Sequence, residues 1–182
     1  MKKYELTDET IEVYGTALHR IKALKDFGNV KKGELGGYVE SEHNLSQEGN
    51  CWVYDNAKVY DNAEVYDNAK VYGKARVCDN AKVYGKARVC DNAEVFGKAR
   101  VCDNAEVFGK ADYITIKGLG SKYRNTTIFR TKENIAVKCG CFYGTLAEFV
   151  DKVKETHGNS KFAKEYLALI DLVKIHFELE DK

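Results

Sequence analysis

A group of basic side chains stands near the C-terminal end of the sequence. Its members are Lys122, Arg124, Arg130, Lys132 and Lys138. Glu133 is the acidic residue among them, and Ser121, Thr126 and Thr127 add hydroxyl groups. Because guanidinium and ammonium groups pair with phosphates and carboxylates, the cluster predicts a site for a small anionic ligand, for example a nucleotide, or for an acidic patch on a protein. The alternative interpretation is a solvated surface that binds no ligand.

Cys139 and Cys141 are separated by one residue, and cysteine is a common zinc ligand. Their thiols fall on one side of a predicted strand, and the sequence offers no matching cysteine pair, so we expect no metal ion and no cofactor. Three other cysteines, Cys78, Cys90 and Cys102, occupy a position that Tyr or Phe fills in neighbouring repeats. All six cysteines are therefore expected to be thiols.

The middle third of the chain consists of ten repeats of six residues. Valine recurs at every sixth position from Val53 to Val107, and an alanine follows each valine after four residues, as far as Ala111. A period of six does not fit the 3.6 residues of a helical turn, but it suits a short strand plus a corner, repeated and stacked. The sequence therefore predicts a solenoid.

Within one repeat, alternate side chains face opposite sides of a short strand. Ala69 and Val71 point one way, and Lys70 and Tyr72 point the other way. The small and branched residues are expected to face inward. The two positions that follow are Asp-Asn or Gly-Lys, and Gly or Asn can adopt the positive φ that a tight corner needs.

Two coil geometries fit these repeats. If three repeats form a triangular coil, residues eighteen positions apart stack at a spacing of about 4.8 Å. From residue 67 onward the sequence also repeats every twelve residues, which fits a flattened coil with Cys78, Cys90 and Cys102 in one column. We favour the triangle, because every corner and every inward pair is equivalent at a period of six.

The triangular coil predicts which outward side chains stack. The aromatic and thiol columns are Tyr54, Tyr72, Cys90 and Phe108; Tyr60, Cys78 and Phe96; and Tyr66, Tyr84 and Cys102. The columns beside them are Trp52, Lys70, Arg88 and Glu106; Lys58, Arg76 and Glu94; and Glu64, Lys82 and Arg100. The second set mixes charges of both signs. We expect the aromatic residues to form a face for self-association or for a partner.

The unbroken pattern Val-x-x-x-Ala-x resembles the hexapeptide-repeat left-handed parallel β-helix, in which three hexads form one triangular coil. The resemblance implies a mainly β fold with a triangular β-solenoid, and it says much less about activity. Proteins of this class are often trimers that pack along their solenoid walls. The resemblance therefore also implies a homo-oligomer, with a trimer favoured.

The segments on either side of the repeats predict two caps around the solenoid at 51–112. Residues 1–50 are expected to form an N-terminal β-rich cap, with strands separated by a turn at 7–10. Residues 113–182 are expected to form a small C-terminal α/β unit that ends in two helices, the first starting at a capping box at 145–148. The strands predicted before these helices are 114–116, 127–130 and 135–139.

Segments of both caps carry a second resemblance. They are Leu35–Glu42, Asn44–Asn50 and Cys139–Leu146, and they resemble segments of hexapeptide-repeat proteins that occur widely in phages and prophages. Together with the repeats they span nearly the whole chain. The resemblance implies a phage accessory protein, and some such proteins act against host defence.

Charge and composition exclude several classes of function. Lys and Arg number 29 and Asp and Glu number 28, so the net charge gives no reason to expect a nucleic-acid-binding protein. The N-terminal residues are not followed by an apolar run long enough for a signal peptide or a membrane span. We expect a cytoplasmic protein without a membrane partner, located in the host cytoplasm if a phage encodes it.

The hexapeptide class is best known for acyltransferases, which typically use a histidine as general base in a cleft between neighbouring subunits. The repeats from Val53 to Ala111 contain no histidine and no insertion. His43 lies close to the start of the repeats, and His19, His157 and His176 lie in the caps. We therefore predict a non-enzymatic phage or prophage interaction protein, in its sharper form an inhibitor of host antiviral defence that binds a host protein or sequesters an anionic nucleotide signal. The alternative is a hexapeptide-type acyltransferase.

Overall fold

The computed structural model describes residues 1–179, and the chain divides into two compact units between Lys110 and Ala111. The fold is mainly β, as predicted, with a parallel β-solenoid of about 4 turns and two C-terminal helices. The N-terminal strands and the solenoid share the first unit. Within the described part of the chain, no helix combines the length and the apolar character that crossing a bilayer requires.

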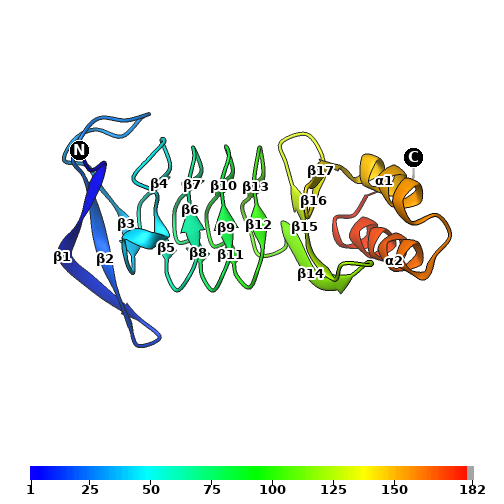
Figure 1. The fold of residues 1–182 in the computed structure, drawn as a ribbon. Helices are drawn as coiled ribbons and strands as arrows, with labels where there is room; N and C mark the ends of the chain where they lie inside the picture. Colours follow the sequence, from blue (N-terminus) through cyan, green and yellow to red (C-terminus); the bar gives the residue numbers. More distant parts are fainter. Residues whose placement is uncertain (180–182) are drawn as a thin grey trace. The chain divides into compact units, whose positions relative to one another are not determined.

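An antiparallel hairpin opens the first unit (Figure 1). Strand β1 (Tyr4–Val13) pairs with β2 (Thr16–Ala23) across a turn at Tyr14 and Gly15, which both have the positive φ that tight hairpin turns favour. The turn predicted at residues 7–10 is wrong. These residues form an irregular stretch inside β1, because the strand stays paired with β2 on both sides of it.

Ten two-residue strands build the solenoid, and Figure 1 shows its coils stacked on one another. They are β4 (Trp52–Val53), β5 (Lys58–Val59), β6 (Glu64–Val65), β7 (Lys70–Val71), β8 (Arg76–Val77), β9 (Lys82–Val83), β10 (Arg88–Val89), β11 (Glu94–Val95), β12 (Arg100–Val101) and β13 (Glu106–Val107). Val71 pairs in parallel with Val53 on one side and Val89 on the other, so residues eighteen positions apart are neighbours. Three repeats therefore form one coil, and the twelve-residue coil is excluded.

The repeat predicts the inside of the solenoid correctly. All ten valines from Val53 to Val107 are buried, and so are the alanines from Ala57 to Ala105. Ala111, the last alanine of the pattern, is exposed. The apolar column is thus continuous through the coils, and its burial is the main favourable contribution to their stability.

The hairpin continues one wall of the solenoid. Strand β3 (Leu35–Val39) pairs antiparallel with β2 and parallel with β5, which gives a sheet in the order β1-β2-β3-β5-β8-β11. Gly36 and Gly37 lie at this junction, where a Cβ on Gly37 would stand 2.5 Å from the carbonyl oxygen of Ala57. A side chain at either position would clash with its neighbours, so both positions require glycine.

Aspartate carries the positive φ at most corners of the coils. The residues are Asp55, Asp61, Asp67, Asp79, Asp91 and Asp103, with φ between 53° and 59°. The sequence predicts Gly or Asn in this role, and Gly fills it at other corners, but Asn occupies the next position instead. Asp tolerates the left-handed region because its short side chain bonds to nearby backbone. Oδ2 of Asp67, for example, accepts from the backbone N–H of Gly85 at 3.1 Å, one coil further on.

Side chains on the outer faces stack at the predicted spacing of eighteen. Tyr54 lies on Tyr72 with ring centroids 4.7 Å apart, and Tyr66 lies on Tyr84 with centroids 4.9 Å apart. Ion pairs join the charged columns from coil to coil, at Arg76–Glu94, Lys82–Glu64 and Arg88–Glu106. The mixed-sign columns therefore compensate their own charge.

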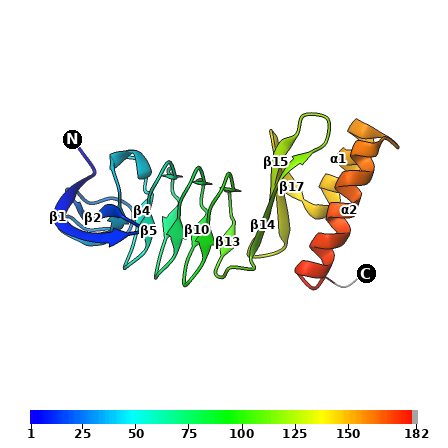
Figure 2. The same ribbon diagram turned by 90° about the horizontal axis from the view of Figure 1, so that it is seen from below.

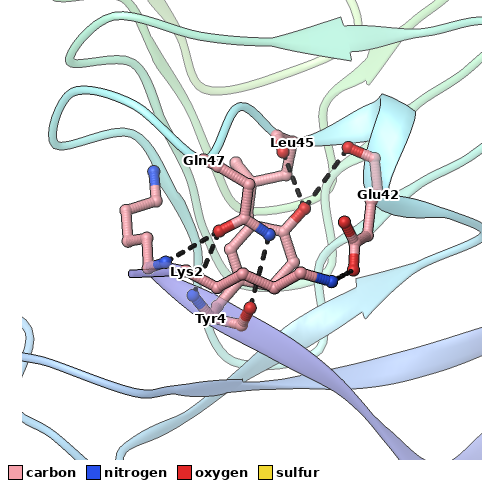
Figure 3. A network of polar contacts seen from close by, with 6 residues as sticks. Lys2, Tyr4, Glu42, Leu45 and Gln47 are labelled. Atoms are coloured by element: carbon pink, nitrogen blue, oxygen red, sulfur yellow. Dashed lines mark hydrogen bonds and ion pairs between the residues drawn. The ribbon is translucent and has the colours of Figure 1, made fainter.

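The N-terminal strand covers the first coil and is held there by a side-chain amide (Figure 3). Oε1 of Gln47 accepts from the backbone N–H of Lys3 at 2.8 Å and of Tyr4 at 3.3 Å, and Nε2 donates to the Tyr4 carbonyl. Trp52, predicted in an outward column, is fully buried under Tyr4 and Phe27, whose ring centroids lie 6.0 and 5.3 Å away. This cover is the reason that the outward prediction is wrong for Trp52.

The same cover removes Tyr60 from the exposed aromatic face. Its ring is 6% exposed and packs with Leu18 of β2 and Tyr38 of β3. The prediction of an exposed partner face is therefore wrong at Tyr60, because the hairpin lies over that part of the wall. Cys102, predicted to point outward, is also buried.

The second unit is an antiparallel sheet with both helices on one face (Figure 2). Its elements are β14 (Tyr113–Leu119), β15 (Arg124–Arg130), β16 (Ile135–Cys139), β17 (Phe142–Thr145), α1 (Leu146–His157) and α2 (Lys161–His176). Ile128 and Val137 of the sheet pack against Phe149 of α1 and Val173 of α2. The sheet order follows the chain, β14-β15-β16-β17.

The sequence predicts both helices and three of these four strands. The capping box is present, because Thr145 Oγ1 accepts from the Glu148 N–H at 3.3 Å while the Glu148 carboxylate accepts from the Thr145 N–H at 2.7 Å. Strand β17 is missing from the prediction. It runs directly into this capping box, so the helix signal hides the short strand before it.

Candidate functional site

Three ionisable side chains meet at the start of the wall formed by β6, β9 and β12. His43 belongs to the short 3₁₀ helix η1 (Glu42–Asn44), and its Nε2 lies 4.0 Å from Oε1 of Glu64. Nζ of Lys82 donates to the same Glu64 oxygen at 2.7 Å. The Glu64 carboxylate thus stands between an imidazole and an ammonium group.

A buried asparagine holds η1 against the coil. Nδ2 of Asn44 donates to the carbonyl oxygens of Asp61 at 2.9 Å and Ala63 at 3.0 Å. Oδ1 of Asn44 accepts from the backbone N–H of Ser41 at 2.9 Å. These three bonds fix the backbone beside His43, while the His43 side chain stays 59% exposed.

This arrangement can move a proton. An imidazole can act as a general base, and a neighbouring carboxylate stabilises the imidazolium that forms. The separation of 4.0 Å between His43 and Glu64 is an ion-pair distance and is longer than a hydrogen bond. Lys82 Nζ also contacts Oε1 of Glu64, at 2.7 Å, and this ion pair anchors the carboxylate.

The sequence reasoning missed this group. Glu64 follows His43 by 21 positions, whereas the repeats stack every 18 residues, so the repeat pattern does not link the two residues. Two of the other histidines bond to backbone carbonyls instead. His19 Nδ1 lies 3.1 Å from the Thr7 oxygen, and His176 Nε2 lies 2.8 Å from the Ala111 oxygen.

The five basic residues predicted as one cluster are separated in the structure. Arg124 and Arg130 stand at opposite ends of β15, about 20 Å apart at roughly 3.3 Å per residue. Lys122 and Arg124 line a pocket of about 300 Å³, whereas Arg130 and Lys132 border another of about 530 Å³. Lys138 lines neither pocket. The structure therefore divides four of these residues between two pockets, and ligand binding at either pocket stays a prediction.

The remaining aromatic residues of the predicted partner face lie on the solenoid surface. Phe96 and Phe108 are 51% and 38% exposed. The stacked tyrosines Tyr54, Tyr66, Tyr72 and Tyr84 are half-buried. Self-association or partner binding through these residues stays a prediction.

The two cysteines considered for zinc lie in different environments. Cys139 is buried and accepts a hydrogen bond from Thr126 Oγ1 at 3.2 Å, whereas Cys141 is exposed. Within residues 1–179, no group of three or more His, Cys, Asp or Glu side chains has a geometry suited to a metal ion.

Part of the chain is similar to a known protein. No family model matches the chain. The chain is similar to the protein named Uncharacterized acetyltransferase YdcK of Escherichia coli (strain K12), with 39% identity over 67 residues. The match covers 32% of this chain and 21% of that protein, so the chain spans about a fifth of the relative's length.

This similarity corrects the functional prediction. A non-enzymatic interaction protein of phage origin was expected, but the relative is named as an acetyltransferase, and the comparison provides no link to phages or to host defence. The prediction that the protein is not an enzyme is contradicted for the same reason. The finding favours the alternative that the sequence left open, the hexapeptide-type acyltransferase.

Proposed function

We propose that this protein is a hexapeptide-type acyltransferase, which moves an acyl group from a thioester donor to a nucleophilic acceptor. The similarity to a protein named as an acetyltransferase supports the reaction class. The observation that carries the proposal in this chain is the placement of His43 against Glu64 on the wall of the solenoid. Because the match covers 21% of the relative, the proposal concerns the reaction and leaves the acceptor to experiment.

In the proposed step, His43 acts as the general base. Its imidazole takes the proton of an acceptor hydroxyl or amine as that group attacks the thioester carbonyl carbon. A C–O or C–N bond forms, the C–S bond breaks, and the imidazolium returns the proton to the leaving thiolate. Glu64 stabilises the transient imidazolium, and Lys82 positions Glu64 through their 2.7 Å ion pair.

The proposal includes self-association. The His43 side chain is 59% exposed, whereas acyl transfer to an acceptor other than water requires that solvent be excluded from the thioester. A second copy packed along the solenoid would provide this exclusion. Phe96 and Phe108, which are exposed on the other two walls of the solenoid, are apolar residues that such packing would cover. A trimer is the form that the hexapeptide class favours. Because acyl thioesters are made and consumed inside the cell, the proposal places the protein in the cytoplasm.

Light scattering coupled to gel filtration tests the assembly. The double variant Phe96→Ser, Phe108→Ser should reduce the measured mass from that of an oligomer to that of a 20.6 kDa chain without changing the circular dichroism melt. A wild-type protein that elutes as a monomer at all concentrations contradicts the proposed assembly.

Mass spectrometry tests the activity. The protein is incubated with acetyl-CoA and a panel of small amines and alcohols, and both the acetylated product and the released CoA are measured. The six cysteines of the chain can themselves accept acetyl groups, so turnover must exceed six acetyl groups per chain. The proposal is contradicted if acetyl-CoA disappears no faster with the protein than in buffer alone, whichever class of acceptor is added.

A further inference from the structure

The second unit contains a pocket of about 300 Å³ between its sheet and helix α1. Phe149 and Val153 of α1, each 3% exposed, form its deep apolar wall together with Phe142 of β17. Tyr166 of α2, 5% exposed, closes the same wall. Such a wall accepts a flat apolar group, and the volume is at the small end of the range for ligand pockets.

The rim of this pocket is basic. Lys122, Arg124 and Lys152 line it and are exposed, and no acidic side chain lines it. Lys152 pairs with Glu155 at 2.8 Å, whereas neither Lys122 nor Arg124 forms an ion pair with any residue from 1 to 179. The mouth of an apolar pocket therefore carries two positive charges, on Lys122 and Arg124, that no ion pair within residues 1–179 neutralises.

The rim arginine is positioned by the turn between β16 and β17. Gly140 has φ of 60° in this turn, and a Cβ on it would collide with the guanidinium of Arg124. The guanidinium therefore lies directly on the glycine. The nearby Tyr166 phenol donates to the Leu119 carbonyl at 3.3 Å, and burial raises its pKa, so the wall stays uncharged at neutral pH.

We propose that this pocket binds a small organic anion with a flat apolar body and one carboxylate or phosphate group. The apolar body lies against Phe149 and Val153, and the anionic group reaches Arg124 and Lys122, whose donors match the oxygens of either group. All of these residues belong to the second unit, so the inference does not depend on the acyl transfer proposed for the solenoid.

Isothermal titration calorimetry with four probes tests the site. Benzoate and phenyl phosphate carry both features, inorganic phosphate lacks the apolar body, and benzyl alcohol lacks the charge. We expect benzoate or phenyl phosphate to bind at least tenfold more tightly than the other two probes. Which of these two binds more tightly identifies the anionic group.

Two variants locate the binding. Arg124→Gln with Lys122→Gln should weaken binding about 10- to 100-fold, the usual effect of losing charge-assisted hydrogen bonds. Thr156→Trp, at an exposed helix position that lines the pocket, should fill the space and abolish binding without removing a charge. Lys138→Gln is the matched control, because Val137 and Cys139 face the helices and Lys138 therefore faces the other side of the sheet.

Any of three results overturns the inference. The first is that neither benzoate nor phenyl phosphate binds, and the second is that benzyl alcohol binds as tightly as they do. The third is unchanged affinity in the double charge variant or in Thr156→Trp, with circular dichroism melts confirming that both variants are folded. Loss of acetyl transfer in a His43 variant would leave these results unaffected, so the two proposals fail separately.

Discussion

Nε2 of His43 lies 4.0 Å from Oε1 of Glu64, although the two residues belong to successive coils of the solenoid. Their approach depends on the stacking of the coils, since 21 positions separate them in sequence. Lys82, a coil further on, holds the same carboxylate oxygen. The proposed acyl transfer therefore requires an intact solenoid.

Val83→Asp should unfold the first unit. Val83 is fully buried in the middle of the apolar column, so a carboxylate there would be cut off from solvent. Burying an unpaired polar or charged group costs several kcal/mol, a large part of the stability of an ordinary domain. Asn80→Asp, at an exposed corner, adds the same charge and should leave the melt within about 0.5 kcal/mol of wild type, as surface substitutions usually do. A Val83→Asp protein with a wild-type circular dichroism melt would contradict the inward assignment.

Variants at Asp67 should separate backbone strain from hydrogen bonding at a corner. Asp67 has φ of 59°, and its carboxylate accepts from the Gly85 N–H at 3.1 Å. Asp67→Ala loses the bond and strains the backbone, at a cost of about 1–3 kcal/mol. Asp67→Gly should lose only the bond, and Asp67→Asn should stay close to wild type because Asn tolerates this conformation. Urea unfolding measures the series, and an Ala variant more stable than the Gly variant would contradict the account of the corner.

The free energy of unfolding should fall as the pH rises above about 10, the ordinary pKa of tyrosine. Burial raises the pKa of tyrosines in both units, to about 12 for Tyr54. Below pH 10 these phenols are neutral in both states. Between pH 10 and the raised values the unfolded chain loses protons that the folded chain keeps, so the unfolded state is favoured.

Absorbance at 295 nm follows this ionisation directly. A fraction of the twelve tyrosines should ionise only when the circular dichroism signal is lost. If all tyrosines ionise near pH 10 while the fold remains intact, their burial in solution differs from that described above.

The inner part of the solenoid was predictable from sequence, because alternation along a strand and a period of six are local properties. Val71 and Ala69 are assigned inward from their own repeat, and the pairing of Val71 with Val89 follows from three repeats per coil. Trp52 and Tyr60 were assigned outward by the same rule. Their burial depends on side chains of residues 1–39, which the repeat does not describe: Tyr4 and Phe27 cover Trp52, and Leu18 and Tyr38 pack on Tyr60.

The candidate site was not predictable for a related reason. Val39 pairs with Val59, twenty positions on, whereas Val53 pairs with Val71, eighteen positions on. The first coil is thus two residues longer than the others, and only the structure shows where His43 comes to lie. The predicted basic cluster shows the opposite effect. Arg124 and Arg130 are close in sequence, but the extended strand β15 holds them apart.

The initial rate of acetyl transfer by His43→Ala tests the central claim most directly. General acid–base catalysis usually contributes 10²- to 10⁴-fold, so the rate should fall by about that factor with an unchanged melt. Glu64→Gln should show a smaller loss, and His19→Asn, which keeps a donor for the Thr7 carbonyl, should match wild type. If His43→Ala transfers acetyl groups at the wild-type rate, His43 is not the general base and the proposed site is contradicted.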